Sequence, residues 1–209
     1  SLVLREAAKR NIKVLATPHQ SPDWSRATSG SVQRFPDNPA DIKPWATWMA
    51  RTFGNQVMAW EIWNEPNLEE FTGVADLDTQ AKRYVPLLKA AHDGLKAGQS
   101  NAVVVFGGPA MTDAEFIEKS YQLGAKNYFD VMSYHPYQGN RIKPPEAADL
   151  YNKSRMTYSP EVFKVMAKHG DAKKPVWWTE LGYSVHSNDK VPPNEVWRLG
   201  LATNEIAAD

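Results

Sequence analysis

The sequence contains no cysteine, which excludes disulfide bonds, a thiol nucleophile and any metal site built on thiolates. It also lacks an excess of charge, since 24 lysine and arginine residues balance 24 aspartate and glutamate residues. Without a basic surface, nucleic acid and anionic membranes are poor candidates for a partner. No apolar run reaches the roughly 18 residues needed to span a bilayer, so no membrane span is predicted.

The residues of a folded core are present in ordinary amounts. Hydrophobic residues make up 42% of the 209 positions and charged residues 23%, a balance typical of one globular domain over residues 1–209. Aromatic residues reach 11%, and flat aromatic rings both fill cores and stack against sugars. The first residues have the pattern of a helix already under way, so the lack of a signal peptide says little about secretion.

Short apolar runs alternate with amphipathic stretches along the chain. The runs lack strict two-residue alternation, as expected for strands covered on both faces. Strands are predicted at residues 12–17, 57–63, 102–106, 129–134 and 176–180. Helices are predicted over 42–53 before Gly54, over 78–98 capped by Asp78, from a capping box of Thr112 and Glu115, from Ser159 and Pro160, and over about 195–207.

This repetition of strand and helix, with a period of about 40 residues, predicts a parallel α/β sheet. A closed (β/α)8 TIM barrel has eight strands and typically about 250 residues. The pattern leaves the sheet open or closed, and a closed barrel with five strands in a chain of 209 residues would be incomplete. Two long loops, at 18–39 and 137–158, follow strand ends on the face where such barrels hold their active sites.

Two glutamates stand where predicted strands end. Glu65 follows the strand at 57–63, and Pro66 after it prevents further strand pairing. Glu180 ends the strand at 176–180, shortly before Gly182. The ends of parallel strands share one edge, so the two carboxylates can converge, and retaining glycosidases use such a pair about 5–5.5 Å apart. One such glutamate alone would more simply be a solvated rim residue, so the inference depends on the pair.

The sequence around these glutamates resembles clan A glycoside hydrolases, with family 39 and its relatives nearest and family 5 next. The resemblance extends from residue 8 to about residue 207 and follows strands three to seven of that barrel in order. The motifs are Arg10-Asn11-Ile12-Lys13-Val14, Trp63-Asn64-Glu65-Pro66-Asn67, Val105-Phe106-Gly107-Gly108-Pro109, Asp130-Val131-Met132-Ser133-Tyr134-His135-Pro136-Tyr137 and Thr179-Glu180-Leu181-Gly182. It implies hydrolysis of a β-type O-glycosidic bond in an oligo- or polysaccharide, with retention and with no metal or organic cofactor.

The resemblance also implies residue roles. Glu65 would be the acid/base, and Glu180 would be the nucleophile that forms a covalent glycosyl-enzyme intermediate. Substrate contacts are implied for Asn64, His135, Tyr137, His19 and Trp178, with Trp24 as a weaker choice. Within this set, Asn64 would bind the sugar 2-hydroxyl, Tyr137 would donate to the nucleophile, and His135 and His19 would lie near the −1 subsite. Glu61 is left out, because it is expected to point the opposite way from Trp60.

Several of these assignments have simpler structural alternatives. His135 could cap a strand, His19 could be a loop residue, and Trp178 could belong to the core because it lies inside a strand. Metal binding by His19, His135 and Glu180 is a further alternative, but no His-x-His or His-Glu-x-x-His spacing supports it. The basic residues of the second long loop favour either an acidic polysaccharide or a solvated loop face; they are Arg141, Lys143, Lys153 and Arg155.

Strands one, two and eight of the family barrel have no counterpart in the sequence. The chain could be a fragment, a module whose barrel another chain or segment completes, or a degenerate relative. The last explanation gives the alternative function, a catalytically weak carbohydrate-binding or cell-wall-associated domain. An unrelated (β/α) enzyme such as an isomerase is disfavoured, because no phosphate-binding glycine loop appears. Localisation stays open, and only the class of substrate favours a secreted or cell-envelope protein.

Overall fold

The computed structural model describes residues 1–26, 33–137 and 156–182. Parallel pairing joins β1 (Leu15–Ala16) to β2 (Ala59–Glu61) and β2 to β3 (Val104–Val105). A second parallel pair consists of β4 (Met132–Tyr134) and β5 (Val176–Trp178). A parallel bridge between Val105 and Val131 connects the two groups, so the five strands lie side by side in chain order.

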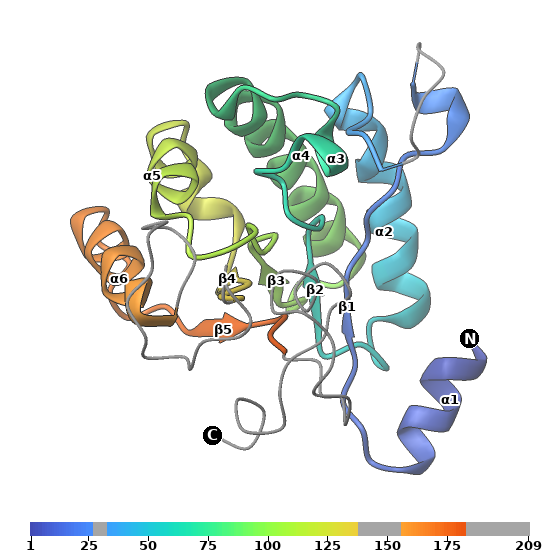
Figure 1. The fold of residues 1–209 in the computed structure, drawn as a ribbon. Helices are drawn as coiled ribbons and strands as arrows, with labels where there is room; N and C mark the ends of the chain where they lie inside the picture. The colour runs from blue at the N-terminus through green and yellow to red at the C-terminus, as the bar shows by residue number, and fades with distance from the viewer. Residues whose placement is uncertain (27–32, 138–155, 183–209) are drawn as a thin grey trace, which may run out of the picture.

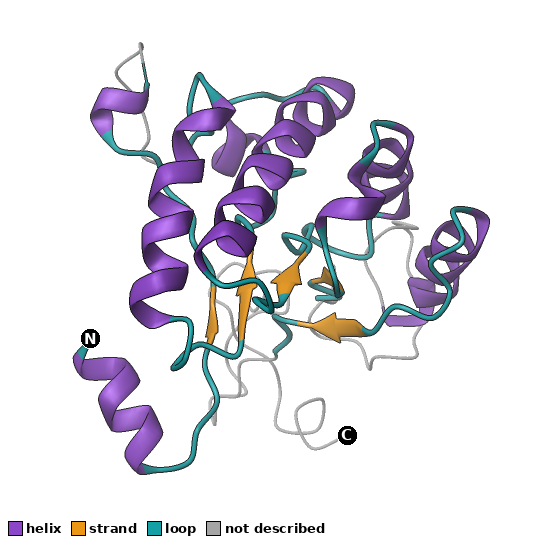
Figure 2. Ribbon diagram, turned by 180° about the vertical axis from the view of Figure 1, so that it is seen from behind, coloured by secondary structure: helices purple, strands orange, loops and turns teal. Residues whose placement is uncertain are grey.

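Helices cover one face of these strands (Figure 1). The covering helices are α2 (Ile42–Phe53), α4 (Leu77–Gly98), α5 (Ala114–Gln122) and α6 (Ser159–Lys168). The view from behind shows the same arrangement, with the strands on the inner side of the helices (Figure 2). Strand and helix alternate along the chain, as in an α/β barrel. A complete barrel of this kind has eight strands, and the described residues supply five.

Shorter elements complete the described chain. Helix α1 (Leu2–Lys9) precedes β1, and the single-turn helix α3 (Glu69–Thr72) follows β2. Four 3-10 turns occupy Asp23–Ser25, Pro39–Asp41, Ala125–Tyr128 and Met156–Tyr158. Within the described residues, no helix combines the length and the apolar character needed to cross a membrane.

Strand side chains divide between two apolar layers. Trp60, Phe106 and Tyr134 point outward and are buried against the helices in the main core. Ala59, Val105 and Val131 form a separate inner cluster with partly buried side chains such as Leu15 and Trp177. This inner cluster is the packed interior of the barrel, where such folds place layers of side chains from successive strands.

Helices α4 and α2 pack closely against each other. Gly94 and Gly98 of α4 face α2 with no side chain between the two backbones. A Cβ atom at Gly94 would lie 2.5 Å from the carbonyl oxygen of Lys43, and one at Gly98 would lie 2.5 Å from that of Thr47. The two glycines therefore set the distance between the helices.

The predicted strands and helices are confirmed in place, but several boundaries differ. The strands are only two or three residues long. The cap of α4 is Asp76, not Asp78, because the Asp76 carboxylate accepts from the Thr79 amide at 2.8 Å. The cap of α5 is Asp113, not Thr112, because Asp113 accepts from the Phe116 amide at 3.1 Å.

A further boundary difference concerns the start of α6. Ser159 is the first residue of α6 rather than its cap, with Tyr158 before it. Pro86 lies inside α4 without ending the helix, on an exposed side. The helix predicted at 195–207 and most of the loop predicted at 137–158 lie outside the described residues.

Candidate active site

Glu65 leaves the end of β2 through a sharply bent backbone. The φ angle is 43° at Glu65 and 76° at Trp63, a region that residues with side chains rarely occupy and that is common at functional sites. Two backbone bonds hold the bend: the Trp63 amide donates to the carbonyl of Pro18 at 3.1 Å, and the Glu65 amide to that of Gly108 at 3.0 Å. The bend fixes the Glu65 side chain, 15% exposed, at the carboxyl edge of the sheet.

Asn67 ties this bend to the loop after β3. Its side-chain nitrogen donates to the Ala110 carbonyl and to Oδ2 of Asp113, both at 3.0 Å. Its side-chain oxygen accepts from the Ala110 amide at 2.7 Å. The sequence analysis assigned no role to Asn67, although its place in the same motif as Glu65 was a signal that it helps to shape this turn.

Glu65, His135 and Glu180 converge at the sheet edge. His135 Nδ1 lies 3.1 Å from Oε1 of Glu65 and 3.7 Å from Oε2 of Glu180. One oxygen of each carboxylate and one ring nitrogen all lie within 4.8 Å of one another. The hydroxyl of Tyr137 lies 3.4 Å from the same Oε2 of Glu180. The limit of 4.8 Å between one oxygen of Glu65 and one of Glu180 is close to the roughly 5–5.5 Å of retaining glycosidases and well below the roughly 6.5–9.5 Å of inverting ones.

His135 is enclosed, whereas the carboxylates open toward solvent. Its side chain is 1% exposed and that of Glu180 is 44% exposed. Among the described residues, His135 Nε2 is buried without a hydrogen-bond partner, and a Cβ atom at Gly108 would lie 2.3 Å from it. Gly108 thus leaves the space that the imidazole fills. The arrangement fits the tautomer in which Nδ1–H donates to Glu65, because Nε2 faces no acceptor.

Asn64 and His19 are available for a ligand. Asn64 is half-buried beside Glu65, and within the described residues its amide makes no hydrogen bond. His19 follows β1, the neighbour of β2, and its Nδ1 is buried without a partner. Both side chains therefore retain hydrogen-bonding groups at the carboxyl edge of the sheet, where the resemblance placed them.

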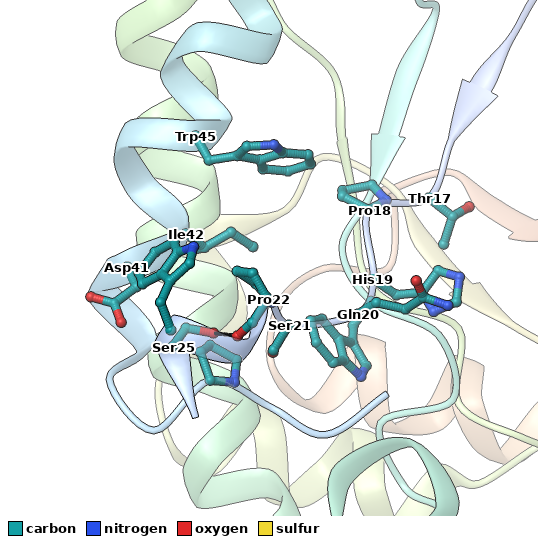
Figure 3. Close-up of a pocket in the computed structure, with 13 residues that line it drawn as sticks. Thr17, Pro18, His19, Gln20, Ser21, Pro22, Ser25, Asp41, Ile42 and Trp45 are labelled. Carbon is teal, nitrogen blue, oxygen red and sulfur yellow. Dashed lines mark hydrogen bonds between the residues drawn. The ribbon is translucent and has the colours of Figure 1, made fainter. Parts of the chain in front are cut away.

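A pocket of about 720 Å³ opens between the loop after β1 and helix α2 (Figure 3). His19, Trp63, Trp45 and Trp24 are among the residues that line it, and Trp45 and Trp24 are exposed there. Neither Glu65 nor Glu180 lines this pocket. Trp63, which is part of the pocket lining, stands two residues before Glu65 in the chain.

The structure does not bring Trp178 to the other predicted site residues. Its neighbour Thr179 points into the barrel interior and donates to Glu61, so Trp178 points outward. There it lies 6.4 Å from the Tyr134 ring and lines a shallow hollow with Phe163 of α6. With 46% of its surface exposed it is not fully core either. The prediction that Trp178 stacks against a sugar at this site is corrected accordingly.

Glu61 was not expected at the site from the sequence, and the structure places it among the ends of the same strands. It does point away from Trp60, as expected, but that direction is the barrel interior, where it is 3% exposed. Its carboxylate accepts hydrogen bonds from Thr17, Gly108, Ser133 and Thr179. The alternation of side chains along a strand could have indicated this, since Glu61 lies two residues after the inward-facing Ala59 and so on the same side of the strand.

Tyr84 is a buried tyrosine that lies near the ends of β2 and β3. The Tyr84 hydroxyl accepts from the Gly107 amide at 2.6 Å and donates to the Ile62 carbonyl at 3.3 Å. Burial raises the pKa of Tyr84 far above its usual range, and the negative charge of Glu61 adds to this rise. Tyr84 therefore stays a neutral hydrogen-bonding link between β2 and the loop after β3.

Metal binding by this group of residues is chemically conceivable. Two carboxylates and one imidazole within 4.8 Å are a donor set that divalent cations accept. The set differs from the one considered from the sequence, because Glu65 takes the place of His19. Two of these three residues, Glu65 and Glu180, are also the ones expected to carry acid/base and nucleophilic chemistry, so a chelator experiment has to separate the two possibilities.

Comparison with solved structures places the fold among glycoside hydrolases. A monomeric β-xylosidase from Caulobacter crescentus is similar with a TM-score of 0.65 and 17% identity, over 86% of this chain and 39% of that one. A family 39 enzyme from Xanthomonas axonopodis pv. citri is similar with a TM-score of 0.64 and 19% identity, over 86% and 38%. A β-glucuronidase from Bacteroides uniformis gives 0.56 and 14%, over 88% and 19%.

These likenesses establish the fold, and the chain spans about two fifths of the first two structures. No curated protein matches the chain. A family model, described as cellulase of glycosyl hydrolase family 5, matches residues 2–208, which is almost the entire chain. The resemblance to clan A glycoside hydrolases is thereby confirmed, and the chain belongs to the cellulase family, glycosyl hydrolase family 5.

Proposed function

We propose that this chain carries the catalytic centre of a retaining glycoside hydrolase that cleaves a β-type O-glycosidic bond in an oligo- or polysaccharide. The observation that carries the proposal is the approach of Glu65 and Glu180 to within 4.8 Å at the carboxyl edge of a parallel sheet. Membership of the cellulase family supports it, since the pair stands in strand-end motifs similar to those of that clan.

Each step would use both carboxylates. In the first, Glu180 attacks the anomeric carbon while Glu65 gives its proton to the glycosidic oxygen, so that the glycosidic bond breaks and a glycosyl ester forms on Glu180. In the second, Glu65 takes a proton from water as the water oxygen attacks the same carbon, and Glu180 leaves as a carboxylate. Two inversions at one carbon give net retention.

The neighbouring side chains would position these groups. Tyr137 would donate to the Glu180 oxygen that lies 3.4 Å from its hydroxyl. His135 would donate to Glu65 and keep its carboxyl group directed at the substrate. Asn64 and His19, which lack hydrogen-bond partners among the described residues, would bind sugar hydroxyl groups.

The remaining barrel strands would come from a further segment or a further chain. Among the described residues, β1 and β5 each pair with a strand on one side only. An open edge in a parallel sheet leaves backbone groups that a neighbouring strand would satisfy. Strands β1 to β5 would then correspond to strands three to seven of the complete barrel.

The test compares wild type with Glu65→Gln and Glu180→Gln on aryl β-glycosides and polysaccharides, and NMR reads the anomer of the first product. Retention in the wild type, with at least about 1,000-fold lower kcat in each variant, is the expected result. Glu69→Gln, which alters an exposed carboxylate just past the same strand, is the matched control and should keep wild-type activity. A first product of inverted configuration would overturn the nucleophile assignment.

Added azide sharpens the assignment. With Glu180→Ala, the small anion can enter the space of the removed carboxylate and give a glycosyl azide of inverted configuration. With Glu65→Ala, it enters the space of the acid/base, attacks the glycosyl ester and gives a retained azide. Activity that survives a strong chelator separates this chemistry from metal catalysis, whereas loss of activity and its recovery with a divalent cation would favour the metal site.

A second candidate function is a catalytically weak carbohydrate-binding domain. The observation that favours it is the open sheet, with five strands among the described residues. This function predicts sugar binding without turnover, and Glu65→Ala would leave the affinity nearly unchanged. Calorimetry with the same sugar panel distinguishes it from the enzyme.

A further inference from the structure

Glu61 is an acidic side chain buried in the barrel interior. It is the last residue of β2 and is 3% exposed. No lysine, arginine or histidine of the described chain lies within 4 Å of its carboxylate. A buried carboxylate is costly unless hydrogen-bond donors replace its water. An apolar residue, like the Ala59 and Val105 packed nearby, would fill the interior without that cost.

Three donors converge on a single oxygen of this carboxylate. Oε1 of Glu61 accepts from the Thr179 hydroxyl at 2.6 Å and from the Gly108 amide at 3.2 Å, and it lies 2.7 Å from the Ser133 hydroxyl, whose single hydrogen also faces the Phe106 carbonyl. Its other oxygen, Oε2, accepts from the Thr17 hydroxyl at 3.3 Å. These donors come from the ends of β1, β4 and β5 and from the loop after β3, so one side chain joins every strand end of the described sheet.

Each of the three groups around Oε1 is directly connected to a residue of the proposed site. Thr179 immediately precedes Glu180, and Ser133 lies two residues before His135 on the same face of β4. The carbonyl of Gly108 accepts from the Glu65 amide at 3.0 Å. The position of the nucleophile, that of the acid/base and that of the histidine between them therefore depend on one carboxylate.

We propose that Glu61 is a positioning residue that sets the separation between Glu65 and Glu180. It acts through Thr179 on the nucleophile and through Gly108 on the acid/base, and it does not touch the substrate itself. The inference rests on the proposed glycosidase function and deepens it. Because a displacement of about 1 Å at a reacting group can lower a rate about 100-fold, loss of this link should reduce kcat far more than it changes KM.

The experiment measures kcat, KM and melting temperature for Glu61→Gln, Thr179→Val and the double variant. We expect Glu61→Gln to lower kcat about 100-fold, with KM within about twofold of wild type. Thr179→Val keeps the side-chain volume and should lower kcat in the same direction. The conservative Thr179→Ser, which restores the hydroxyl, should recover most of the rate.

The double variant decides whether Glu61 acts through Thr179. If it does, Glu61→Gln will lower kcat much less in the Thr179→Val background than in the wild type. Fully additive losses, or an unchanged kcat in Glu61→Gln, would overturn the proposal. Should Glu61→Gln fail to fold, the Thr179→Val and Thr179→Ser pair still decides, since equal kcat values in both would refute the link.

A matched control separates positioning from stability. Asp171 is also a buried carboxylate that accepts from a hydroxyl, that of Tyr121 at 3.0 Å, but it lies between α6 and β5 in the chain and also pairs with Lys174 at 2.9 Å. Asp171→Asn should lower the melting temperature and leave kcat within about twofold of wild type. The wild type tests the proposed glycosidase function, and absence of wild-type turnover would contradict that function. If the wild type turns over substrate and Glu61→Gln has the same kcat, only the positioning role of Glu61 is contradicted.

Discussion

Single hydrogen bonds hold the proposed site together at the scale of residues. Tyr137 directs its hydroxyl at Glu180, His135 lies between the two carboxylates, and Gly108 leaves room for the imidazole. The Tyr137 contact involves one atom pair, so one substitution can remove it.

We expect Tyr137→Phe to lower kcat about 100-fold with little change in KM. The substitution keeps the ring and removes only the hydroxyl that lies 3.4 Å from Oε2 of Glu180. That hydroxyl would steady the nucleophile as its charge changes between the ester and the free carboxylate. Steady-state kinetics on an aryl glycoside measure the effect. Equal kcat values in the variant and wild type would remove Tyr137 from the mechanism.

Much of this constellation could be predicted from the sequence, because strand ends and motif positions are local features. Glu65, Glu180, His135 and Tyr137 fall together as expected. Glu61 could not be recognised in the same way, since its significance comes from partners up to 118 residues away in the chain. Trp178 was misplaced for the same reason, because the face of the strand on which it lies is decided by how the neighbouring Thr179 bonds across the barrel.

Helix contacts set the geometry at the scale of elements. Helix α2 packs on α4 through glycine and alanine, with Gly94 and Gly98 against Ala46 and Ala50. Helix α5 is joined to α6 through Glu118, which bonds Lys168 and His169. The first contact depends on shape and the second on charge, so they should respond differently to mutation and to pH.

Gly94→Ala should destabilise the protein by about 1–3 kcal/mol, because overpacking forces the two helices apart. In an exposed helix the same change would stabilise by about 1 kcal/mol through helix propensity. The new Cβ atom would lie 2.9 Å from that of Ala46, so the substitution is expected to lower the free energy of unfolding here instead of raising it. Urea unfolding measures it, with the exposed Lys82→Ala in the same helix as control. Increased stability in Gly94→Ala would contradict the tight contact.

The α5–α6 contact should weaken in acid. The bond from Lys168, together with those from Gln122 and His169, lowers the pKa of Glu118 from 4.5 to about 2. A carboxyl group whose pKa is lowered by folding stabilises fully above its unfolded pKa. That stabilisation is lost as the pH falls from about 4.5 to about 2.

Glu118→Gln should therefore reduce the stability difference between pH 6 and pH 3. Urea titrations at both values provide the measurement, and Glu161→Gln, which removes an exposed pair with Lys164 on α6, serves as control. An unchanged difference in Glu118→Gln would show that this carboxylate does not contribute to the acid sensitivity.

Element positions were predicted well because hydrophobic periodicity and strand breakers are local. The exact caps were not, because Asp76 and Asp78 are both suitable and only the bond to Thr79 distinguishes them. The tight helix pair was not foreseen either, since glycine lowers helix propensity and its benefit appears only when a second helix lies against it.

The whole molecule presents apolar residues at both ends of its open sheet. Leu2, Val3 and Ile12 are exposed near β1, and Phe163, Trp178 and Leu181 are exposed near β5. Such surfaces usually lie against another part of a protein. The alternation of strand and helix predicted the barrel correctly, but no pattern in the sequence indicates what covers these two ends.

The isolated chain of 209 residues should therefore associate as its concentration rises. Sedimentation velocity over the micromolar range is the measurement, and Phe163→Lys, which places a charge at the β5 end, should reduce the association. A single monomeric species at all concentrations, for wild type and variant alike, would show that these apolar surfaces do not drive self-association.

The order of the strands also makes curvature a condition for the chemistry. Three steps separate β2 from β5, and neighbouring strands are about 4.8 Å apart, so their ends would be about 14 Å apart on a flat sheet. The carboxylates at these ends instead approach to within 4.8 Å. Flattening of the sheet would carry them beyond the roughly 5–5.5 Å at which a nucleophile and an acid/base can act on one glycosidic bond with retention. The rate of turnover is thus a measure of how far the strands curve toward a closed barrel.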